Sequence, residues 1–213
     1  MSMRFKWRRA AIMACLCAGI AGCSGGSNTT YFTTRGLKAP QAQCTVDPRT
    51  VAVAEPIRDI RERSGCQVEN AYRVSSIGGI SFSQPAIMNC GMIGPLDTWF
   101  NDTVQPAAQR AFGESVVAVN VAASYACRPR NNKRGAKMSE HGFGNAIDIA
   151  SFTLESGRKV EVEQGYFSWS EKAFIKEVRK GACEDFNTVL GPGDAHHNDH
   201  IHVDRANRSR KLC

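Results

Sequence analysis

The sequence predicts an α+β domain in which helices pack on a small antiparallel sheet. Apolar residues recur at helical spacing in residues 94–113, and a second helical pattern covers residues 170–186. Short stretches with strand character at residues 116–127 and 146–163 indicate strands. At 213 residues the chain suits one such domain, or one domain plus an appendage, and it is long enough to bury a core.

Each helical pattern contains a residue that should start or interrupt the helix. In "GPLDTWFNDTVQPAAQRAFG" the apolar positions include Leu96, Trp99 and Val104. Pro106 should kink this helix or start a new segment, because proline lacks a backbone N–H and its ring clashes inside a helix. In "SEKAFIKEVRKGACEDF" we expect Ser170 to be the N-cap.

Four segments have the composition or the alternation of strands. "IGGISFSQPAIM" alternates weakly and predicts a short strand, and "VVAVNVAASYAC" is rich in β-formers. "AIDIASFTL" alternates between apolar and polar residues, and "ESGRKVEVE" after it predicts a turn and a second strand. These strands are short, which favours a small sheet.

The N-terminus has the pattern of an export signal. Basic residues precede an apolar run at residues 10–20, which predicts a signal peptide over residues 1–22. The ending "IAGC" resembles the bacterial lipobox, in which the thiol of the cysteine, here Cys23, receives a diacylglycerol. The alternative is cleavage near Gly22 and a soluble secreted protein. Ser24 is not the aspartate that resembles an inner-membrane retention signal.

We therefore expect a protein of the bacterial cell envelope on its periplasmic side. A lipid at Cys23 would attach it to the outer membrane, if the organism has one. Residues 23–40 are rich in Gly, Ser and Thr and predict a flexible tether, and the domain should cover residues 41–213.

Export changes how the charge and the cysteines are interpreted. Four of the 27 basic residues lie in the signal segment, so the mature chain carries about +3, too little to indicate a nucleic-acid partner. An even set of cysteines in an oxidising compartment predicts three disulfides. Fifteen connectivities are possible, and we favour Cys183 with Cys213. No CxxC pair is present, which argues against a thiolate zinc site. The mature domain contains Cys44, Cys66, Cys90, Cys127, Cys183 and Cys213.

Four of the five histidines fall within ten residues, "AHHNDHIHVD". In a strand, side chains alternate between the two faces. His200, His202 and Asp204 should therefore lie on one face, and Ile201 and Val203 should pack inward on the other.

The remaining histidine lies close to a strand that carries an aspartate. His141 belongs to "SEHGFGNAIDIA", where Asp148 should face away from its apolar neighbours. If the two strands are adjacent, His141, Asp148 and His202 converge. Two imidazoles and one carboxylate, with a fourth position open, form the ligand set of a catalytic zinc rather than a structural one. We expect one Zn²⁺ per chain.

The segment "SEHGFGNAID" is similar to the Ser-x-His-x-x-Gly-x-Ala-x-Asp motif of zinc D,D-peptidases related to VanY, which share the hedgehog fold. The wider arrangement "SYACR…SEHGFGNAIDIASF…VLGPGD…HHNDHIHVD" resembles the bacterial extensin-like C-terminal domain family over about residues 41–213. The resemblance implies a disulfide-stapled hedgehog/D,D-peptidase-like fold. It also implies that His141, Asp148 and His202 are the zinc ligands.

The resemblance suggests roles for the neighbouring residues. Asp199 precedes His202 by three residues, the offset of the acidic base in VanY-like enzymes, and we favour it as general base. His200 is the alternative, because His197 and His200 also match the His-x-x-His-x-His spacing of the murein endopeptidase branch. His197 and Ser139 should support the ligands, and His196 should be a solvated loop residue or a further donor to them.

Arg128 occupies the place of a substrate-binding arginine in VanY-type enzymes, where a cation would stabilise a developing oxyanion. The alternative is a surface arginine in the basic loop "RPRNNKRGAK". Together these residues predict a zinc metallopeptidase acting on peptidoglycan stem peptides, with a D-Ala bond as the family-level expectation. Carboxypeptidase and endopeptidase action are both open, and the alternative function is a non-catalytic zinc-containing wall-binding module of the same fold.

Overall fold

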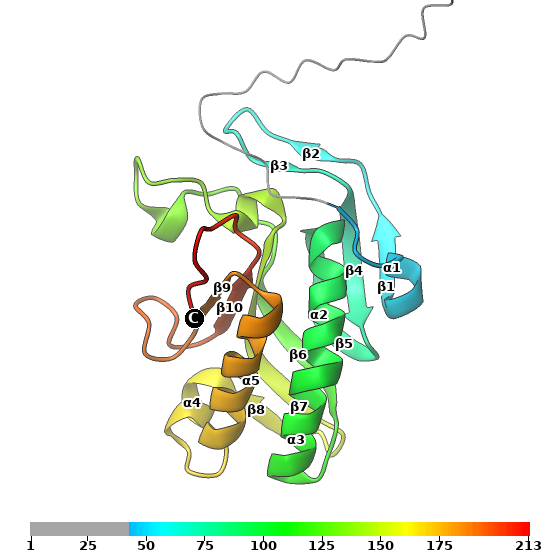
Figure 1. Ribbon diagram of the computed structural model, residues 1–213, viewed down its shortest axis with the longest axis vertical. Helices are drawn as coiled ribbons and strands as arrows, with labels where there is room; N and C mark the ends of the chain where they lie inside the picture. The colour runs from blue at the N-terminus through cyan, green and yellow to red at the C-terminus, as the bar shows by residue number, and fades with distance from the viewer. Residues whose placement is uncertain (1–42) are drawn as a thin grey trace, which may run out of the picture. The chain divides into compact units, whose positions relative to one another are not determined.

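The computed structural model describes residues 43–213, in which helices cover one face of an eight-stranded mixed sheet (Figure 1). The predicted signal peptide, the lipidation site Cys23 and the tether lie outside the described residues. No helix among residues 43–213 combines the length and the apolar character needed to cross a membrane. The predicted α+β class is confirmed.

The first half of the described chain supplies one edge of the sheet and the longest helical run. Its elements are α1 (Pro48–Val51), β1 (Ala52–Pro56), β2 (Ile60–Arg61), β3 (Gln67–Val68), β4 (Ala71–Ile77), β5 (Ile80–Asn89), the 3-10 turn η1 (Cys90–Met92), α2 (Ile93–Trp99), the π-helical turn η2 (Phe100–Val104), α3 (Gln105–Phe112) and β6 (Val116–Ala123).

The second half supplies the strands and turns that carry the histidines. Its elements are the 3-10 turns η3 (Arg130–Asn132) and η4 (Glu140–Phe143), β7 (Ala146–Leu154), β8 (Lys159–Glu161), α4 (Val162–Phe167), α5 (Lys172–Asp185), β9 (Thr188–Leu190) and β10 (Ile201–Asp204).

The sheet has the order β1-β4-β5-β6-β7-β10-β9, with β8 paired to β7. All its strand pairs are antiparallel except β5 with β6, which is parallel. The prediction of a small antiparallel sheet is therefore wrong. The chain between β5 and β6 runs through α2, η2 and α3, and such a long helical crossover allows the next strand to lie parallel to the last.

The helical predictions are confirmed in position and corrected in detail. Pro106 lies in the first turn of α3, directly after the π-helical turn, so a new helical segment starts here as predicted. Ser170 is not the N-cap of α5, which starts after Glu171. The amide of Lys172 donates to the carbonyl of Ser168, so Ser170 lies inside a closed turn and cannot cap the helix.

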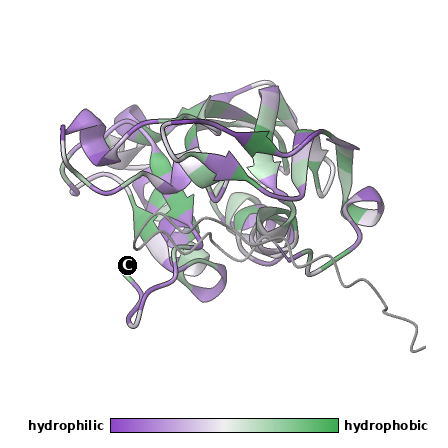
Figure 2. Ribbon diagram, turned by 90° about the horizontal axis from the view of Figure 1, so that it is seen from above, coloured by the Kyte–Doolittle hydropathy of each residue, from purple (hydrophilic) through white to green (hydrophobic). Residues whose placement is uncertain are grey.

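Hydrophobic side chains fill the space between the sheet and its helices. Trp99 stacks on Phe100 and donates its indole N–H to the carbonyl of Val178, which joins α2 to α5. Phe174 of α5 packs edge-on against Phe152 of β7. In Figure 2 green is concentrated in the strands, which also carry purple positions, and the outlying loops are mainly purple. This core supports β7, one of the two strands that carry the site, on the face of the sheet that meets the helices.

Three disulfides close the fold, as the even cysteine count predicts. Cys183 pairs with Cys213, which confirms the favoured pair and ties the C-terminal segment to α5. The other two pairs are Cys44 with Cys90 and Cys66 with Cys127.

Candidate metal centre

A glycine turn brings His141 to the start of β7. His141 is buried in η4, and Gly144 ends this turn with φ = +58°. A Cβ at Gly144 would lie 2.7 Å from Val68 Cγ1 and 2.9 Å from the amide nitrogen of Asn89, so a larger residue does not fit. The chain can therefore turn from His141 into the strand that carries Asp148 only with glycine at this position.

Strand pairing places the other two predicted ligands opposite each other. In the antiparallel pair of β7 and β10, His202 is the direct partner of Asp148. Ile201 and Val203 belong to the hydrophobic core, as strand alternation predicts. The face of the sheet that carries His202 and Asp148 is therefore the one that meets His141.

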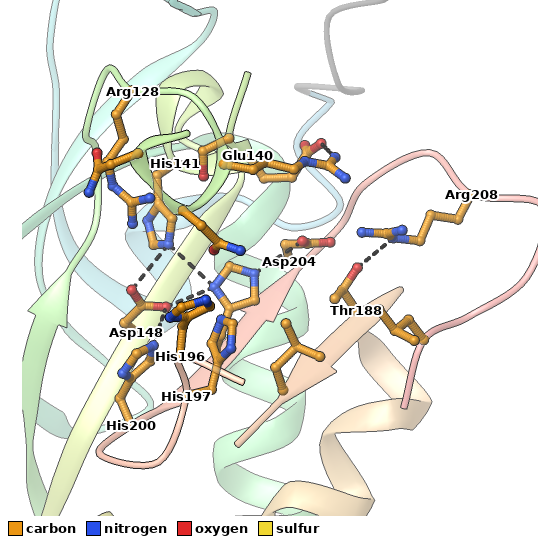
Figure 3. Close-up of a pocket in the computed structure, with 17 residues that line it drawn as sticks. Arg128, Glu140, His141, Asp148, Thr188, His196, His197, His200, Asp204 and Arg208 are labelled. Atoms are coloured by element: carbon orange, nitrogen blue, oxygen red, sulfur yellow. Dashed lines mark hydrogen bonds and ion pairs between the residues drawn. The ribbon is translucent and has the colours of Figure 1, made fainter. Parts of the chain in front are cut away.

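The three side chains converge on one point (Figure 3). His141 Nε2 lies 3.2 Å from Asp148 Oδ2 and 3.3 Å from His202 Nδ1, and His202 Nδ1 lies 2.8 Å from Asp148 Oδ1. All three residues are buried. Their candidate ligand atoms lie within 4.8 Å of one another, so His141, Asp148 and His202 could hold a metal ion.

The second nitrogen of each imidazole has its own partner. His141 Nδ1 donates to the carbonyl of Ser124 at 2.6 Å, and His202 Nε2 donates to Asp204 Oδ2 at 3.1 Å. Outer partners of this kind orient metal-ligating histidines and fix which nitrogen faces the metal. His141 therefore offers Nε2 and His202 offers Nδ1.

The buried carboxylate of Asp148 favours a positive charge among these three residues. Burial alone would raise the pKa of the Asp148 carboxyl, but hydrogen bonds from His141 and His202 hold it far below its usual range. Burial alone would lower the pKa of His202, but hydrogen bonds with Asp148 and Asp204 outweigh it and raise the pKa to about 9. Below pH 9 His202 of the metal-free chain is therefore a cation, and its Nδ1 lies at a position where a metal ion could replace the proton.

The loop before β10 places a further histidine against the group. His200 Nε2 lies 3.7 Å from Asp148 Oδ1, and His200 Nδ1 bonds to Asp199 Oδ1 at 2.7 Å. The carboxylate of Asp199 is 71% exposed and contacts His200 rather than the ligands. His197 is half-buried, and its ring centre lies 5.1 Å from that of His200 and 5.7 Å from that of His202.

A cleft of about 490 Å³ opens over His141, Asp148 and His202, here called the metal group because they could hold a metal ion, and its volume is within the usual range of ligand pockets. Arg128 lies on its wall and is half-buried, and Figure 3 draws it close to His141. Ser139, also on the wall, donates its backbone N–H to the carbonyl of Arg128. The exposed His196 lies on the same wall.

Sequence reasoning missed three features of the site. Asp204 was expected only to share a face with His202, yet it is the carboxylate that orients it. The carbonyl of Ser124 does the same for His141, and no sequence pattern announces a backbone partner. Arg208 also lies on the cleft wall, four residues after the end of the histidine motif and outside every motif of the sequence.

The fold and the site together define a disulfide-stapled α+β domain with a buried two-histidine, one-aspartate group at the floor of a cleft. Residues 42–213 match the family described as extensin-like protein C-terminus. The chain belongs to this family. No curated protein and no solved structure matches the chain.

Proposed function

We propose that this chain is an exported zinc metallopeptidase that hydrolyses peptide bonds of bacterial peptidoglycan, with the hedgehog/D,D-peptidase fold that its motif resembles. The observation that carries the proposal is the buried group of His141, Asp148 and His202 at the floor of an open cleft. Three protein ligands with a free side toward a cleft are typical of catalytic zinc, whereas structural zinc is closed by a fourth protein ligand.

The donor set fits zinc. Two imidazole nitrogens and one carboxylate oxygen suit this metal, and both histidines have the outer partners that such ligands need. Zinc bound here would act as a Lewis acid and lower the pKa of a coordinated water to about 7.

The chain's own residues would then handle the proton and the substrate. We assign the role of general base to His200, because its Nε2 faces the metal group while its Nδ1 is held by Asp199. Asp199, favoured from the sequence pattern, becomes the residue that orients His200. Arg128, on the cleft wall, would bind the carbonyl or carboxylate of the substrate and stabilise negative charge that develops there.

The test measures metal and turnover on the same samples. Purified protein should contain about one zinc per chain and should release D-alanine, or cleave cross-links, when incubated with purified muropeptides at neutral pH. Zinc without product would refute the peptidase and support a wall-binding zinc module. Product release that survives complete removal of the metal would refute the metal-dependent mechanism.

The proposal includes attachment to the envelope by a lipid at Cys23, on the outer membrane where one exists, facing the periplasm. It rests on the signal pattern and the lipobox-like "IAGC". Cys23→Ser should abolish acylation and leave the precursor unprocessed or released. Normal membrane anchoring of this variant would refute the lipid.

A further inference from the structure

The acidic side chains that line the cleft all have partners, whereas two of its arginines have no carboxylate partner within residues 43–213. All three carboxylates have partners: Asp148 with the two histidines, Asp204 with His202, and Glu140 with Asn145 at 2.8 Å and Arg130 at 3.4 Å. Among the described residues, the guanidinium groups of Arg128 and Arg208 have no carboxylate within ion-pair distance. The cleft therefore presents two arginine side chains without a direct ion pair to the described part of the chain, although Arg208 still feels the charge of Glu140 at longer range.

These two arginines lie in different parts of the cleft. Arg128 precedes η4 in the chain, and Arg208 follows β10. Figure 3 draws Arg128 near His141 and Arg208 well apart from it, beyond Asp204 and next to Thr188. A ligand that spans the metal group would therefore contact Arg128 on one side of it and Arg208 on the other.

Contacts with β9 hold Arg208 in place. Its Nε donates to Thr188 Oγ1 at 2.6 Å, and Thr188 is the strand partner of Asp204. This bond uses one of the five guanidinium N–H groups, and none of the other four bonds to a described residue. Arg208 is half-buried, so its charge is partly removed from water while its fork remains free for a ligand.

The segment that carries Arg208 is fixed at both ends. On one side it continues from β10, and on the other the Cys183–Cys213 disulfide closes it onto α5. Between these points Val189 donates its N–H to Leu212, and Leu212 donates to Asn187. A side chain on such a segment is positioned before a ligand arrives, which reduces the entropy lost on binding.

The surroundings of Arg208 indicate what it binds. Both leucines of the cleft lie close to this region: Leu212 forms a β-bridge with Thr188, the residue that holds Arg208, and Leu190 is the strand partner of His202. A planar guanidinium fork matches a carboxylate in two parallel hydrogen bonds. The apolar residues beside it suit the carbon skeleton of a peptide better than a chain of phosphates.

We infer that Arg208, held by Thr188, forms a carboxylate-binding subsite, and that the ligand of this cleft is an acidic peptide with a carboxylate on the Arg208 side of the metal group. This inference rests on the proposed peptidase function and narrows its substrate class. Arg208 is in this view a specificity-determining residue, not a group that takes part in bond cleavage.

Three acetylated tetrapeptides that end in D-Ala-D-Ala test the subsite. The first has a free glutamate side chain and a free C-terminus, the second carries glutamine in place of glutamate, and the third is amidated at the C-terminus. Dissociation constants are measured by calorimetry on zinc-loaded protein in the cold, and KM and kcat are measured for any peptide that is cleaved. Arg208→Gln removes the charge, Arg208→Lys keeps it without the fork, and Arg210→Gln is the control, since Arg210 is exposed and outside the cleft.

We expect Arg208→Gln to weaken binding of the fully acidic peptide about tenfold or more, the scale of a lost hydrogen bond to a charged group. One of the two neutralised peptides should bind the unmodified protein as weakly as the fully acidic peptide binds Arg208→Gln. The Arg208→Gln substitution should not weaken the binding of that neutralised peptide further. Arg208→Lys should recover part of the affinity, Arg210→Gln should change nothing, and kcat should hardly move. Zinc content and melting temperature must match the unmodified protein.

Three results would overturn the subsite. The first is equal affinity of Arg208→Gln and the unmodified protein for the acidic peptide, and the second is an equal loss on all three peptides. The third is binding of a glycerol-phosphate oligomer that depends on Arg208 when binding of the peptides does not. Failure of the proposed peptidase activity gives a different result.

Binding that depends on Arg208, with no cleavage of any peptide, refutes only the peptidase activity. Cleavage whose KM and kcat do not change in Arg208→Gln refutes only the subsite.

Discussion

The metal group and the loop that precedes it both carry histidines, but they differ in how firmly they are held. His141, Asp148 and His202 are 1%, 4% and 8% exposed, and both histidines are fixed by a partner at the second ring nitrogen. In residues 195–200, here called the histidine loop, the side-chain hydrogen bonds stay within a few residues of the chain: His197 bonds to the carbonyl of Ala195, His200 bonds to Asp199, and Asn198 accepts from the amide of Gly193.

The difference in burial and fixation suits the metal group to binding a metal and the histidine loop to transferring a proton. Holding a metal requires donors that do not move, and buried strand positions with satisfied outer partners provide them. Transferring a proton requires a group that reaches both the reacting atoms and the solvent, and His200, with 15% of its side chain exposed, does so. We therefore expect changes in the metal group to remove zinc, and changes in the histidine loop to slow turnover while zinc stays bound.

The largest expected effect is the loss of the metal. His202→Ala and Asp148→Ala should each lower the zinc content from about one equivalent to near zero, because two remaining donors hold the metal poorly. His196→Ala is the matched control, since this exposed loop histidine makes none of these contacts, and it should keep its zinc. Elemental analysis of the three purified variants decides it. Full zinc retention by both His202→Ala and Asp148→Ala would refute the ligand assignment.

The next effect should fall on turnover alone. His200→Ala should reduce muropeptide cleavage by about 10² or more, the scale of a lost general base. Its zinc content should stay at that of the unmodified protein, because His200 is not one of the three donors. His196→Ala again provides the control. A His200→Ala variant that loses both zinc and turnover would break the separation between the two regions.

A smaller effect is expected from the carboxylate behind His202. Asp204→Asn keeps the shape of the side chain but removes the charge that faces His202 Nε2. Zinc affinity should fall about 10- to 100-fold, the usual cost of losing such an outer partner. Competition with a chromophoric chelator measures it. Unchanged affinity would mean that Asp204 serves only the fold.

Zinc affinity should also depend on pH in a defined direction. The pKa of His202 is about 9 in the metal-free chain, and the metal can bind only after this proton has left. Below pH 9 the apparent affinity should therefore fall about tenfold for each pH unit, and above pH 9 it should level off. Chelator competition at several pH values, corrected for the chelator's own titration, tests the slope. A flat profile between pH 7 and 9 would contradict the proton on His202.

Strand periodicity explains why the metal donors could be predicted from the sequence. Alternation alone assigns His202 to one face and Ile201 to the other, and once β7 and β10 are adjacent, Asp148 must face His202. The strands β1 and β4 were missed, because β1 is an edge strand with mostly exposed residues and its pairing with β4 is irregular. The parallel pairing of β5 and β6 depends on how the helices cross the sheet, which local patterns do not determine.

The histidine loop could not be predicted in the same way. Outside a strand no period determines the direction of a side chain, and His196 adopts φ = +67°, a conformation that non-glycine residues seldom take. The sequence offset from His202 favoured Asp199 as base, whereas in the folded loop its carboxylate contacts His200. Experiment is therefore needed most to decide whether Asp199 or His200 is the general base.

The smallest expected effect concerns Asp199 itself. Its carboxylate is 71% exposed, and exposed charge pairs contribute little because water screens them. Asp199→Asn still accepts a hydrogen bond from His200 Nδ1, so turnover should fall by no more than about fivefold, the upper end of what such a pair contributes. Asp199→Ala removes the acceptor and should lose more than Asp199→Asn, and zinc should stay bound in both. The measurements are kcat on muropeptides and zinc content on the same samples, alongside His200→Ala. If Asp199→Asn costs 10² or more while His200→Ala is mild, Asp199 is the base, and the histidine loop must rearrange to bring its carboxylate to the metal group.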